Sequence, residues 1–321
     1  KMYVYSLSFC FLSFLLCLHV LYSAEKYGIG ELEIQLGDSE GLSSSSTISQ
    51  ENLQRILTGV ENGNKENIYF YGLLKLYGIS LSKDLVTAAQ NFNRASQLGH
   101  KEATTAYGVM LMSGHGVRKD LASAIKLFRK AVELGDMNAH WLLGKLLLES
   151  QGASNFAEAA ALFRVAAEGN IPQALHSLAT MYEYGQGVEQ NFDLALKYYR
   201  QAAEQNHIES KYNLALMYAF GRGTEQDFSR ARPLLEAAAQ LNHAPSIYYI
   251  GVFKTYGYGC AINYAQAVNW FERAAGLDDY RVSSKASHAA DELKSKLDAA
   301  VAKNDKLYDQ YLNAGAAFQN Y

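Results

Sequence analysis

The chain has 321 residues, of which 49% are hydrophobic and 19% charged, and its formal net charge is −3 at pH 7. A slightly acidic chain has no basic field with which to attract nucleic acid or an anionic membrane surface, so neither is expected as a partner. The apolar content is sufficient for a large buried core, and a total of three prolines suits a nearly all-helical chain.

Residues 2–24 contain no Asp, Glu, Lys or Arg and are rich in Leu and Phe. We expect residues 1–24 to be a secretory signal peptide that is cleaved near Ala24. An uncharged run of this length also fits an uncleaved signal anchor in a membrane, or a buried helix of the fold. Cleavage would leave Cys260 alone, so that no disulfide could form within the mature chain.

Residues 25–47 pass from charged to Ser-rich and show no periodicity, which predicts a flexible linker. Residues 48–64 fit the second half of the repeat described next, when they are placed 36 residues before its first copy. An end repeat needs a cap, because its apolar face would otherwise contact water. We therefore predict an N-terminal capping helix over 48–64.

A repeating unit fills residues 65–279. Two columns of alanines recur at steps of 36 residues, with a single step of 35 in each column. The first column is Ala88, Ala124, Ala159, Ala195, Ala231 and Ala267, and the second is Ala95, Ala131, Ala166, Ala202, Ala238 and Ala274. These copies predict an all-α fold, a right-handed α-solenoid superhelix of six tandem helical hairpins with capping helices.

Each unit also carries residues that mark where its second helix begins and ends. Asp or Asn precedes the helix as an N-cap, at Asp84, Asp120, Asn155, Asn191, Asp227 and Asn263. A residue that tolerates a left-handed turn follows it, at Gly99, Gly135, Asn170, Asn206, Asn242 and Asp278. In the fifth unit Pro233 lies six residues after Asp227, which predicts that this helix is kinked or begins later than the others.

The order of residues within a unit resembles the Sel-one-like repeat, a relative of the tetratricopeptide repeat. In the fourth unit this order is Ala174, Leu178-Ala179, Tyr182, Gly185-x-Gly187, Asn191, Ala195, Tyr199 and Ala202-Ala203. The resemblance covers residues 65–279, roughly two thirds of the chain. It implies stacked hairpins whose first helices line a concave groove that binds other proteins or peptides.

After the last unit, residues 280–321 are predicted to form a C-terminal capping helix and a tail. Ser283 to Ala302 are rich in Lys and Ala, with Leu293 and Leu297 four residues apart on one helical face. The final residues, 303–321, mix aromatic and polar side chains. They fit either a last helix on the stack or a tail that binds a partner.

Nothing in the sequence predicts catalysis or a cofactor. His100, His207 and His243 share one column between hairpins, which places them a repeat apart instead of around one metal ion. The Gly-x-Gly turns follow helices and lack the Lys-Ser/Thr of a nucleotide site. No nucleophile elbow, zinc-protease motif or paired CxxC is present. We expect no metal, no cofactor and no enzyme activity.

The phase of the related tetratricopeptide stacks selects candidate residues for the groove. In the column two residues before the conserved Leu, five of six residues are aromatic or imidazole, and such side chains are good anchors for a bound protein. The alternative is that tight curvature packs these rings into the core. The candidates in both columns are Tyr69, Thr105, Trp141, Lys145, His176, Thr180, Tyr212, Leu216, Tyr248 and Val252.

The resemblance and the expected leader together suggest a non-catalytic scaffold or adaptor in the secretory pathway, retained in the endoplasmic reticulum lumen or secreted. Secretory members of the family resemble the lumenal adaptor of a membrane ubiquitin ligase in endoplasmic-reticulum-associated degradation, which implies a ligase as one partner. The alternatives are a secreted or cell-surface interaction protein, or a hydrolase-type repeat protein. Relatives of the last kind carry a cysteine pair in each repeat, whereas the repeats here contain only Cys260.

Overall fold

The structure is a computed structural model that describes residues 36–37, 41–42, 48–151, 155–277 and 279–302. The expected leader, most of the expected linker, and the tail after Ala302 lie outside these residues. The described chain contains fourteen helices and one pair of short antiparallel strands, β1 (Leu36–Gly37) and β2 (Gly41–Leu42). It divides into two compact units, residues 1–146 and 147–321, and each is described by itself.

In the first unit, consecutive helices pack against one another as antiparallel hairpins. Their bounds are α2 (Gln50–Glu61), α3 (Lys65–Tyr77), α4 (Leu85–Gln97), α5 (Lys101–Ser113) and α6 (Leu121–Glu133), and α7 (Met137–Gln151) begins in this unit. The core lies between α3, α4 and α5, where Phe70, Phe92 and Ala103 are fully buried. Helix α2 adds Ile56 to the same core.

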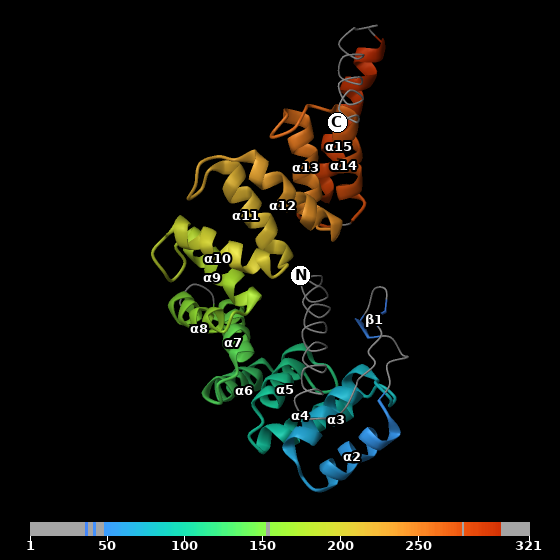
Figure 1. Ribbon diagram of the computed structural model, residues 1–321, viewed down its shortest axis with the longest axis vertical. Helices are drawn as coiled ribbons and strands as arrows, with labels where there is room; N and C mark the ends of the chain where they lie inside the picture. Colours follow the sequence, from blue (N-terminus) through green and yellow to red (C-terminus); the bar gives the residue numbers. More distant parts are fainter. Residues whose placement is uncertain (1–35, 38–40, 43–47, 152–154, 278, 303–321) are drawn as a thin grey trace. The chain divides into compact units, whose positions relative to one another are not determined.

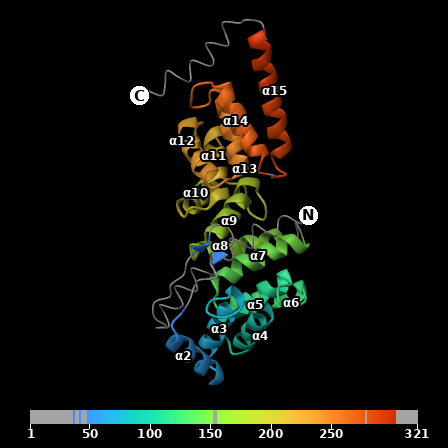
Figure 2. The same cartoon turned by 90° about the vertical axis from the view of Figure 1, so that its right-hand side faces the viewer.

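The second unit, taken by itself, is also built of packed helix pairs, seven in its described residues. Figures 1 and 2 label its helices α8 to α15. Its helices are α8 (Phe156–Glu168), α9 (Pro172–Tyr184), α10 (Phe192–Glu204), α11 (Ile208–Phe220), α12 (Phe228–Gln240), α13 (Ala244–Tyr256), α14 (Tyr264–Ala275) and α15 (Ser283–Ala302). Helix α15 packs on α14, where Leu293 contacts Val268 and Phe271. The predicted all-helical solenoid of hairpins is confirmed.

Most of the predicted N-caps form hydrogen bonds to the helix that follows. Asp120, for example, accepts from the backbone N–H of Ser123, and Asn191 accepts from that of Leu194. Asn155 was predicted to do the same but makes no capping bond. Its side-chain amide donates instead to the carbonyl oxygen of Leu147 at 3.3 Å. The third unit is also one residue shorter than the others in sequence.

The helix ends also follow the predicted residue types. Asn170, Asn206 and Asn242 have φ of 58°, 62° and 57°, the left-handed conformation that ends a helix. Helix α12 begins at Phe228, directly after Asp227, and contains Pro233. The later start that Pro233 suggested is therefore wrong.

A small residue in each first helix allows the second helix of the same hairpin to approach closely. A Cβ atom at Gly251 would lie 2.7 Å from Cε1 of Phe271, a ring that is almost completely buried. The same contact joins Gly72 to Phe92 and Gly108 to Phe128. In each of these three repeats, the two helices of the hairpin therefore pack through one aromatic ring that contacts a glycine.

Replacing Gly251 by Val should lower the free energy of unfolding of the second unit by about 2 kcal/mol. The new side chain would force the Phe271 ring out of its packed position, which outweighs the gain in helix propensity of about 0.5 kcal/mol. Urea unfolding followed by circular dichroism measures the change. Gly276→Val is the control, because a Cβ there would lie 3.5 Å from the nearest atom. An equal loss in both variants would contradict the role of the ring contact.

The Gly-x-Gly turns join one repeat to the repeat before it. A Cβ atom at Gly187 would lie 2.3 Å from the carbonyl carbon of Phe156, at the start of α8. A Cβ atom at Gly223 would likewise lie too close to Phe192, and one at Gly259 too close to Phe228. In the last turn, Cys260 is half-buried and its thiol donates to the Phe253 carbonyl at 3.5 Å.

Candidate partner-binding surface

In the second unit, the candidate residues lie along one stripe of the first helices of three successive repeats. His176 and Thr180 are on α9, Tyr212 and Leu216 on α11, and Tyr248 and Val252 on α13, and each of the six is half-buried. One of them also contacts the next first helix, because the ring centroids of Tyr212 on α11 and Tyr249 on α13 are 5.8 Å apart. We call this stripe of α9, α11 and α13 the first-helix face.

In the first unit, two of the four candidates are buried and not available to a partner. Tyr69 is 1% exposed, and its ring packs on His100 with 4.4 Å between centroids, so it belongs to the core. Thr105 is also buried, and its hydroxyl donates to Asp136, whose pKa is raised by burial. The expectation that Tyr69 and Thr105 line a groove is therefore corrected. Trp141 and Lys145 are half-buried.

The first-helix face includes an aromatic column that the sequence analysis did not select. Tyr184, Phe220 and Tyr256 are the last residues of α9, α11 and α13, four positions after Thr180, Leu216 and Val252. They are 58%, 52% and 63% exposed, which is high for large rings. Their signal in the sequence is the recurrence of an aromatic residue directly before the turn glycine in three successive repeats.

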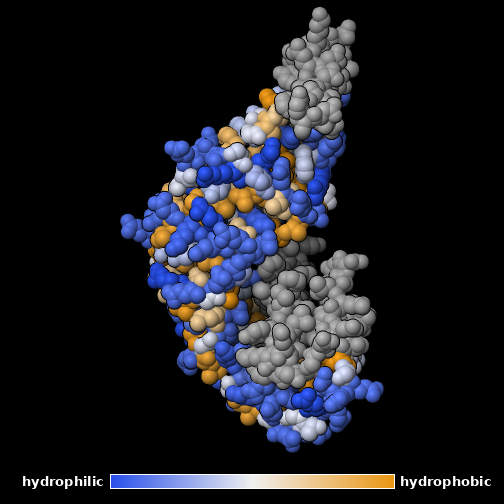
Figure 3. All heavy atoms as spheres, in the orientation of Figure 1, coloured by the Kyte–Doolittle hydropathy of each residue, from blue (hydrophilic) through white to orange (hydrophobic). Residues whose placement is uncertain are grey.

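Hydrophobic side chains also reach the surface elsewhere on the repeats. On the face shown in Figure 3, orange patches lie among hydrophilic residues instead of forming one continuous area. Leu241 and Leu98 are examples of exposed apolar residues outside the first-helix face. Exposure alone therefore does not single out this face, whereas the repetition of aromatic rings does.

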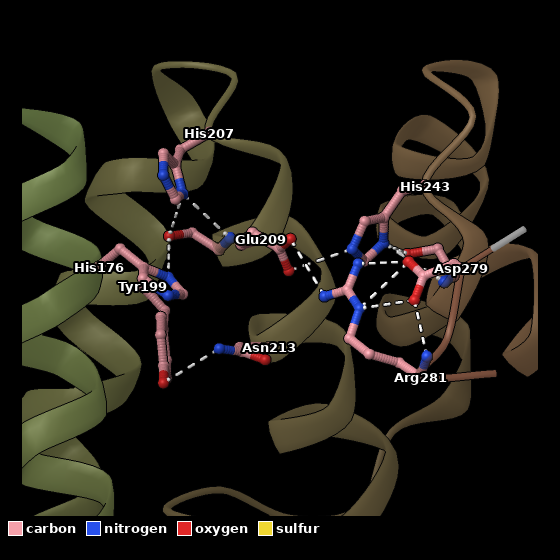
Figure 4. Close-up of polar contacts among 10 residues, drawn as sticks. His176, Tyr199, His207, Glu209, Asn213, His243, Asp279 and Arg281 are labelled. Carbon is pink, nitrogen blue, oxygen red and sulfur yellow. Dashed lines mark hydrogen bonds and ion pairs between the residues drawn. The ribbon is translucent and has the colours of Figure 1, made fainter. Parts of the chain in front are cut away.

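A network of polar side chains lies under the beginning of the first-helix face (Figure 4). The Ser210 hydroxyl lies 3.0 Å from Nδ1 of His176 and 2.9 Å from Nδ1 of His207. His207 Nδ1 also accepts the backbone N–H of Ser210, so it caps α11 and must be unprotonated. Burial lowers the pKa of His176 to about 3 and that of His207 to about 4.

The histidines that share a column are N-caps. Nδ1 of His100 accepts from the backbone N–H of Ala103 at 3.2 Å, and Nδ1 of His243 accepts from that of Ser246 at 3.3 Å. Their spacing in the sequence places these histidines a repeat apart, whereas their role as caps of first helices is seen only in the structure. In this part of the fold, imidazole takes the place that Asn64 occupies before α3.

A charged cluster links the fifth repeat to the segment after the sixth. Nε2 of His243 donates to Glu209 at 3.1 Å, and Arg281 donates to Glu209 at 3.3 Å and to Asp279 at 2.7 Å. Burial opposes ionisation of Glu209, but the His243 hydrogen bond and the Arg281 charge lower its pKa to about 2. The hydrogen bond from Arg281 likewise lowers the pKa of Asp279.

A second charged pair lies at the other end of the face. Glu183 is buried, and its carboxylate accepts from Arg222 Nη1 at 2.5 Å and from the Tyr199 hydroxyl at 2.8 Å. The Tyr199 hydroxyl is also within hydrogen-bonding distance of Thr180 and Asn213. Burial, followed by the Glu183 charge, raises the pKa of Tyr199. The polar groups at both ends of the face thus satisfy one another.

This arrangement does not resemble a catalytic site. Ser210 is the one hydroxyl held between two imidazoles in the network, and it is completely buried, so a substrate cannot reach it. Across the described residues, no group of three His, Cys, Asp or Glu side chains is arranged to hold a metal ion. No helix there is both long and apolar enough to cross a bilayer.

Comparison with known proteins agrees with the repeats seen in the structure. The Sel1 repeat family matches six consecutive stretches of the chain, at residues 68–100, 101–136, 138–171, 172–207, 208–243 and 244–279. No curated protein matches the sequence.

The solved structures that are similar to the chain include two that match it over most of its length. One is a protective antigen present in uropathogenic Escherichia coli strains that displays an SLR fold, with 25% sequence identity and a TM-score of 0.66. The match covers 80% of this chain and 53% of the antigen, so the chain spans about half of the antigen's length. The other is a Sel1 repeat protein from Oxalobacter formigenes, with 26% identity and a TM-score of 0.64, covering 70% of this chain and 90% of that protein.

Proposed function

The chain belongs to the Sel1 repeat family, and from this premise we propose that it is a non-catalytic scaffold that binds another protein on its first-helix face. Sel1 and related repeat proteins generally act as protein-interaction scaffolds. The observation that carries the proposal is the column of exposed rings at Tyr184, Phe220 and Tyr256. A ring kept half exposed in each of three successive repeats contributes little to folding and is available to a partner.

The environment of these rings favours tight contact with a partner. Phe220 packs edge-on against Tyr249 at 6.5 Å, and the Arg222 guanidinium lies 5.6 Å from its ring centre. Phe220 is therefore held in place before binding, which reduces the entropy that a partner must overcome. Aromatic side chains in such positions are the residues that most often dominate the binding energy of an interface.

Replacing Phe220 by Ala should weaken partner binding at least tenfold, as loss of a central anchor does, and leave thermal unfolding nearly unchanged. Partners are identified by proximity labelling in the source cells, and the affinity of a purified partner is measured for each variant. Leu241→Ala is a matched control, because Leu241 is 55% exposed and Phe220 is 52% exposed. Equal binding by both variants and the original protein would overturn the proposal.

For the cellular setting we propose the secretory pathway, with an adaptor role beside a membrane ubiquitin ligase in endoplasmic-reticulum-associated degradation. Its support is the uncharged, Leu- and Phe-rich run of residues 2–24 and the scaffold fold. N-terminal sequencing of the protein from its own cells tests it, with a chain that begins near Glu25 and co-purifies with such a ligase as the expected result. Recovery of surface or secreted partners alone would indicate that the scaffold acts at the cell surface or outside the cell.

A further inference from the structure

Side chains near their first turns link helices α9 and α11. Each of these helices packs on α10, and they are not themselves a packed pair. The Ser210 hydroxyl of α11 lies 3.0 Å from Nδ1 of His176 on α9 and 2.9 Å from Nδ1 of His207, and the two imidazole centroids are 4.9 Å apart (Figure 4). We call these three residues the histidine joint. It connects the fourth repeat to the fifth.

The geometry of the histidine joint depends on neutral imidazoles. Nδ1 of His207 accepts the backbone N–H of Ser210 at 3.2 Å, so a proton on this nitrogen would remove the cap of α11. Protonation of His176 as well would place two positive charges on adjacent rings, which repel each other. Ser210 is completely buried, so water cannot replace a lost hydrogen bond while the joint is closed.

A buried amide beside the joint favours its opening. Gln173 lies one helical turn before His176 and is 6% exposed, and its side-chain oxygen and nitrogen have no hydrogen-bond partner in the described part of the chain. The corresponding residue one repeat later is Glu209, which reaches the next N-cap, His243. The same position in α9 is therefore directed towards the N-cap of α11. Opening there would let water satisfy the amide and recover the free energy that its burial costs.

The groups around the two imidazoles do not neutralise a proton on either ring. Those that can carry a charge come from α10, α11, the start of α13 and the segment after α14, and they are Tyr199, Glu209, His243, Arg281 and Asp279. Glu209 is the anion that attracts protons to both rings, but its carboxylate already accepts from His243 and Arg281. Burial therefore prevails and lowers the pKa of both imidazoles.

We propose that the histidine joint is a pH-sensitive switch between the fourth and fifth repeats, closed in neutral solution and open in mildly acidic solution, where the start of α11 separates from α9. The opposite ends of these helices are held by a different contact, between Arg222 and Glu183. Opening would therefore turn α11 about this contact and reshape the first-helix face. The switch goes beyond the scaffold function, because it operates with or without a partner.

The pKa values give the direction and size of the effect. In the closed joint they are about 3 for His176 and about 4 for His207, whereas an exposed histidine titrates near 6.5. The open state binds more protons between these values, so the closed state is favoured above about pH 6.5 and loses this advantage as the pH falls. Each histidine should shift the equilibrium towards the open state roughly 20-fold between pH 7 and pH 5.

Hydrogen exchange of the full-length protein, read by mass spectrometry at about pH 7.5 and about pH 5, tests the switch. Rates are corrected for the intrinsic exchange rate at each pH. Residues 210–213, at the start of α11, should lose protection at least tenfold in acid. Residues 214–220 should stay protected, because Leu214, Met217 and Ala219 remain buried in the core.

Two variants identify the groups responsible. His176→Gln together with His207→Asn removes both titrating rings, while the asparagine keeps a helix cap, so residues 210–213 should stay protected in acid. His100→Asn is the matched control, because His100 caps α5 in the same way, and it should leave the loss at residues 210–213 unchanged.

Three results would overturn the proposal. Full protection of residues 210–213 at about pH 5 would show that the joint stays closed. Equal loss of protection over residues 210–220 would show that the whole helix unfolds and that no joint opens within the fold. An unchanged loss in the double variant would assign the opening to groups other than the two imidazoles.

Discussion

Replacing Arg222 by Ala is expected to lower the free energy of unfolding of the second unit by about 3 kcal/mol. The substitution leaves the Glu183 carboxylate, which is 5% exposed, without its 2.5 Å partner. Removing one member of a buried ion pair costs about 3–5 kcal/mol because an uncompensated charge stays in the interior. The lower end applies here, since the Arg222 side chain is 38% exposed and water screens the pair. Urea unfolding measures the loss.

The matched control removes the charge together with its partner. Glu183 stands in the column that holds Leu76 and Leu148 in other repeats, so a Leu there suits the fold. In Glu183→Leu with Arg222→Ala, the Tyr199 hydroxyl keeps its contacts with Thr180 and Asn213. The double variant should therefore recover to within about 1 kcal/mol of the original protein. A double variant as unstable as Arg222→Ala alone would contradict a charge-based cause.

The boundaries of the helices could be predicted because their causes are local. An Asp or Asn reaches the backbone N–H groups two or three residues ahead of it, as Asp84 does with Val86 and Thr87. The left-handed φ of Asn206 likewise depends on the residue itself. Asn155 is an exception, because its side-chain amide donates to the Leu147 carbonyl and does not cap the helix that follows.

The exposure of a column could not be predicted from its residue types. Tyr69 and Tyr212 occupy the same column, but Tyr69 is enclosed by the core around Phe92 and His100 while Tyr212 is half-buried. Residues of one column point in the same direction from their helices. Their exposure, however, depends on the neighbouring side chains, which differ between repeats. The ring column of Phe220 lies six residues after the conserved Leu, outside the two columns that the phase of tetratricopeptide stacks selects.

The polar network is even harder to predict from the sequence, because its contacts join residues from different parts of the chain. Arg281 lies after the last repeat, outside every column, and reaches Glu209 from 72 residues away. Ser210 holds His176 and His207 together, although the two histidines lie in different columns and Ser210 belongs to the next repeat. Contacts of this kind follow from how hairpins stack, so only the three-dimensional structure shows them.

The second unit is expected to lose stability steeply as the pH falls below 6.5. In the folded state the pKa of His176 is about 3 and that of His207 about 4, against an ordinary value of about 6.5 in the unfolded chain. Between these values the unfolded chain binds more protons, so stability falls with pH. Near pH 5.5 the two histidines together should lower the free energy of unfolding by roughly 2–3 kcal/mol for each pH unit of acidification.

Glu209 acts in the same direction in more acidic solution. Its folded pKa of about 2 lies below the ordinary value for a glutamate, so its contribution is present above that ordinary value and is lost as the pH falls towards 2. Below about pH 4.5 the carboxylate therefore adds to the loss from the histidines. Urea midpoints measured at intervals from pH 7.5 to pH 4 would follow both contributions in turn.

Two variants identify the histidines as the source of the pH dependence. His207→Asn keeps a capping oxygen at the start of α11, as Asn64 does for α3, and His176→Gln keeps a polar partner for Ser210. Together they should flatten the stability curve between pH 7 and pH 5, because neither new side chain titrates there. His288→Asn, an exposed change on α15, should leave the curve steep. If the double variant remains as acid-sensitive as the original protein, the loss arises elsewhere and the buried imidazoles do not control it.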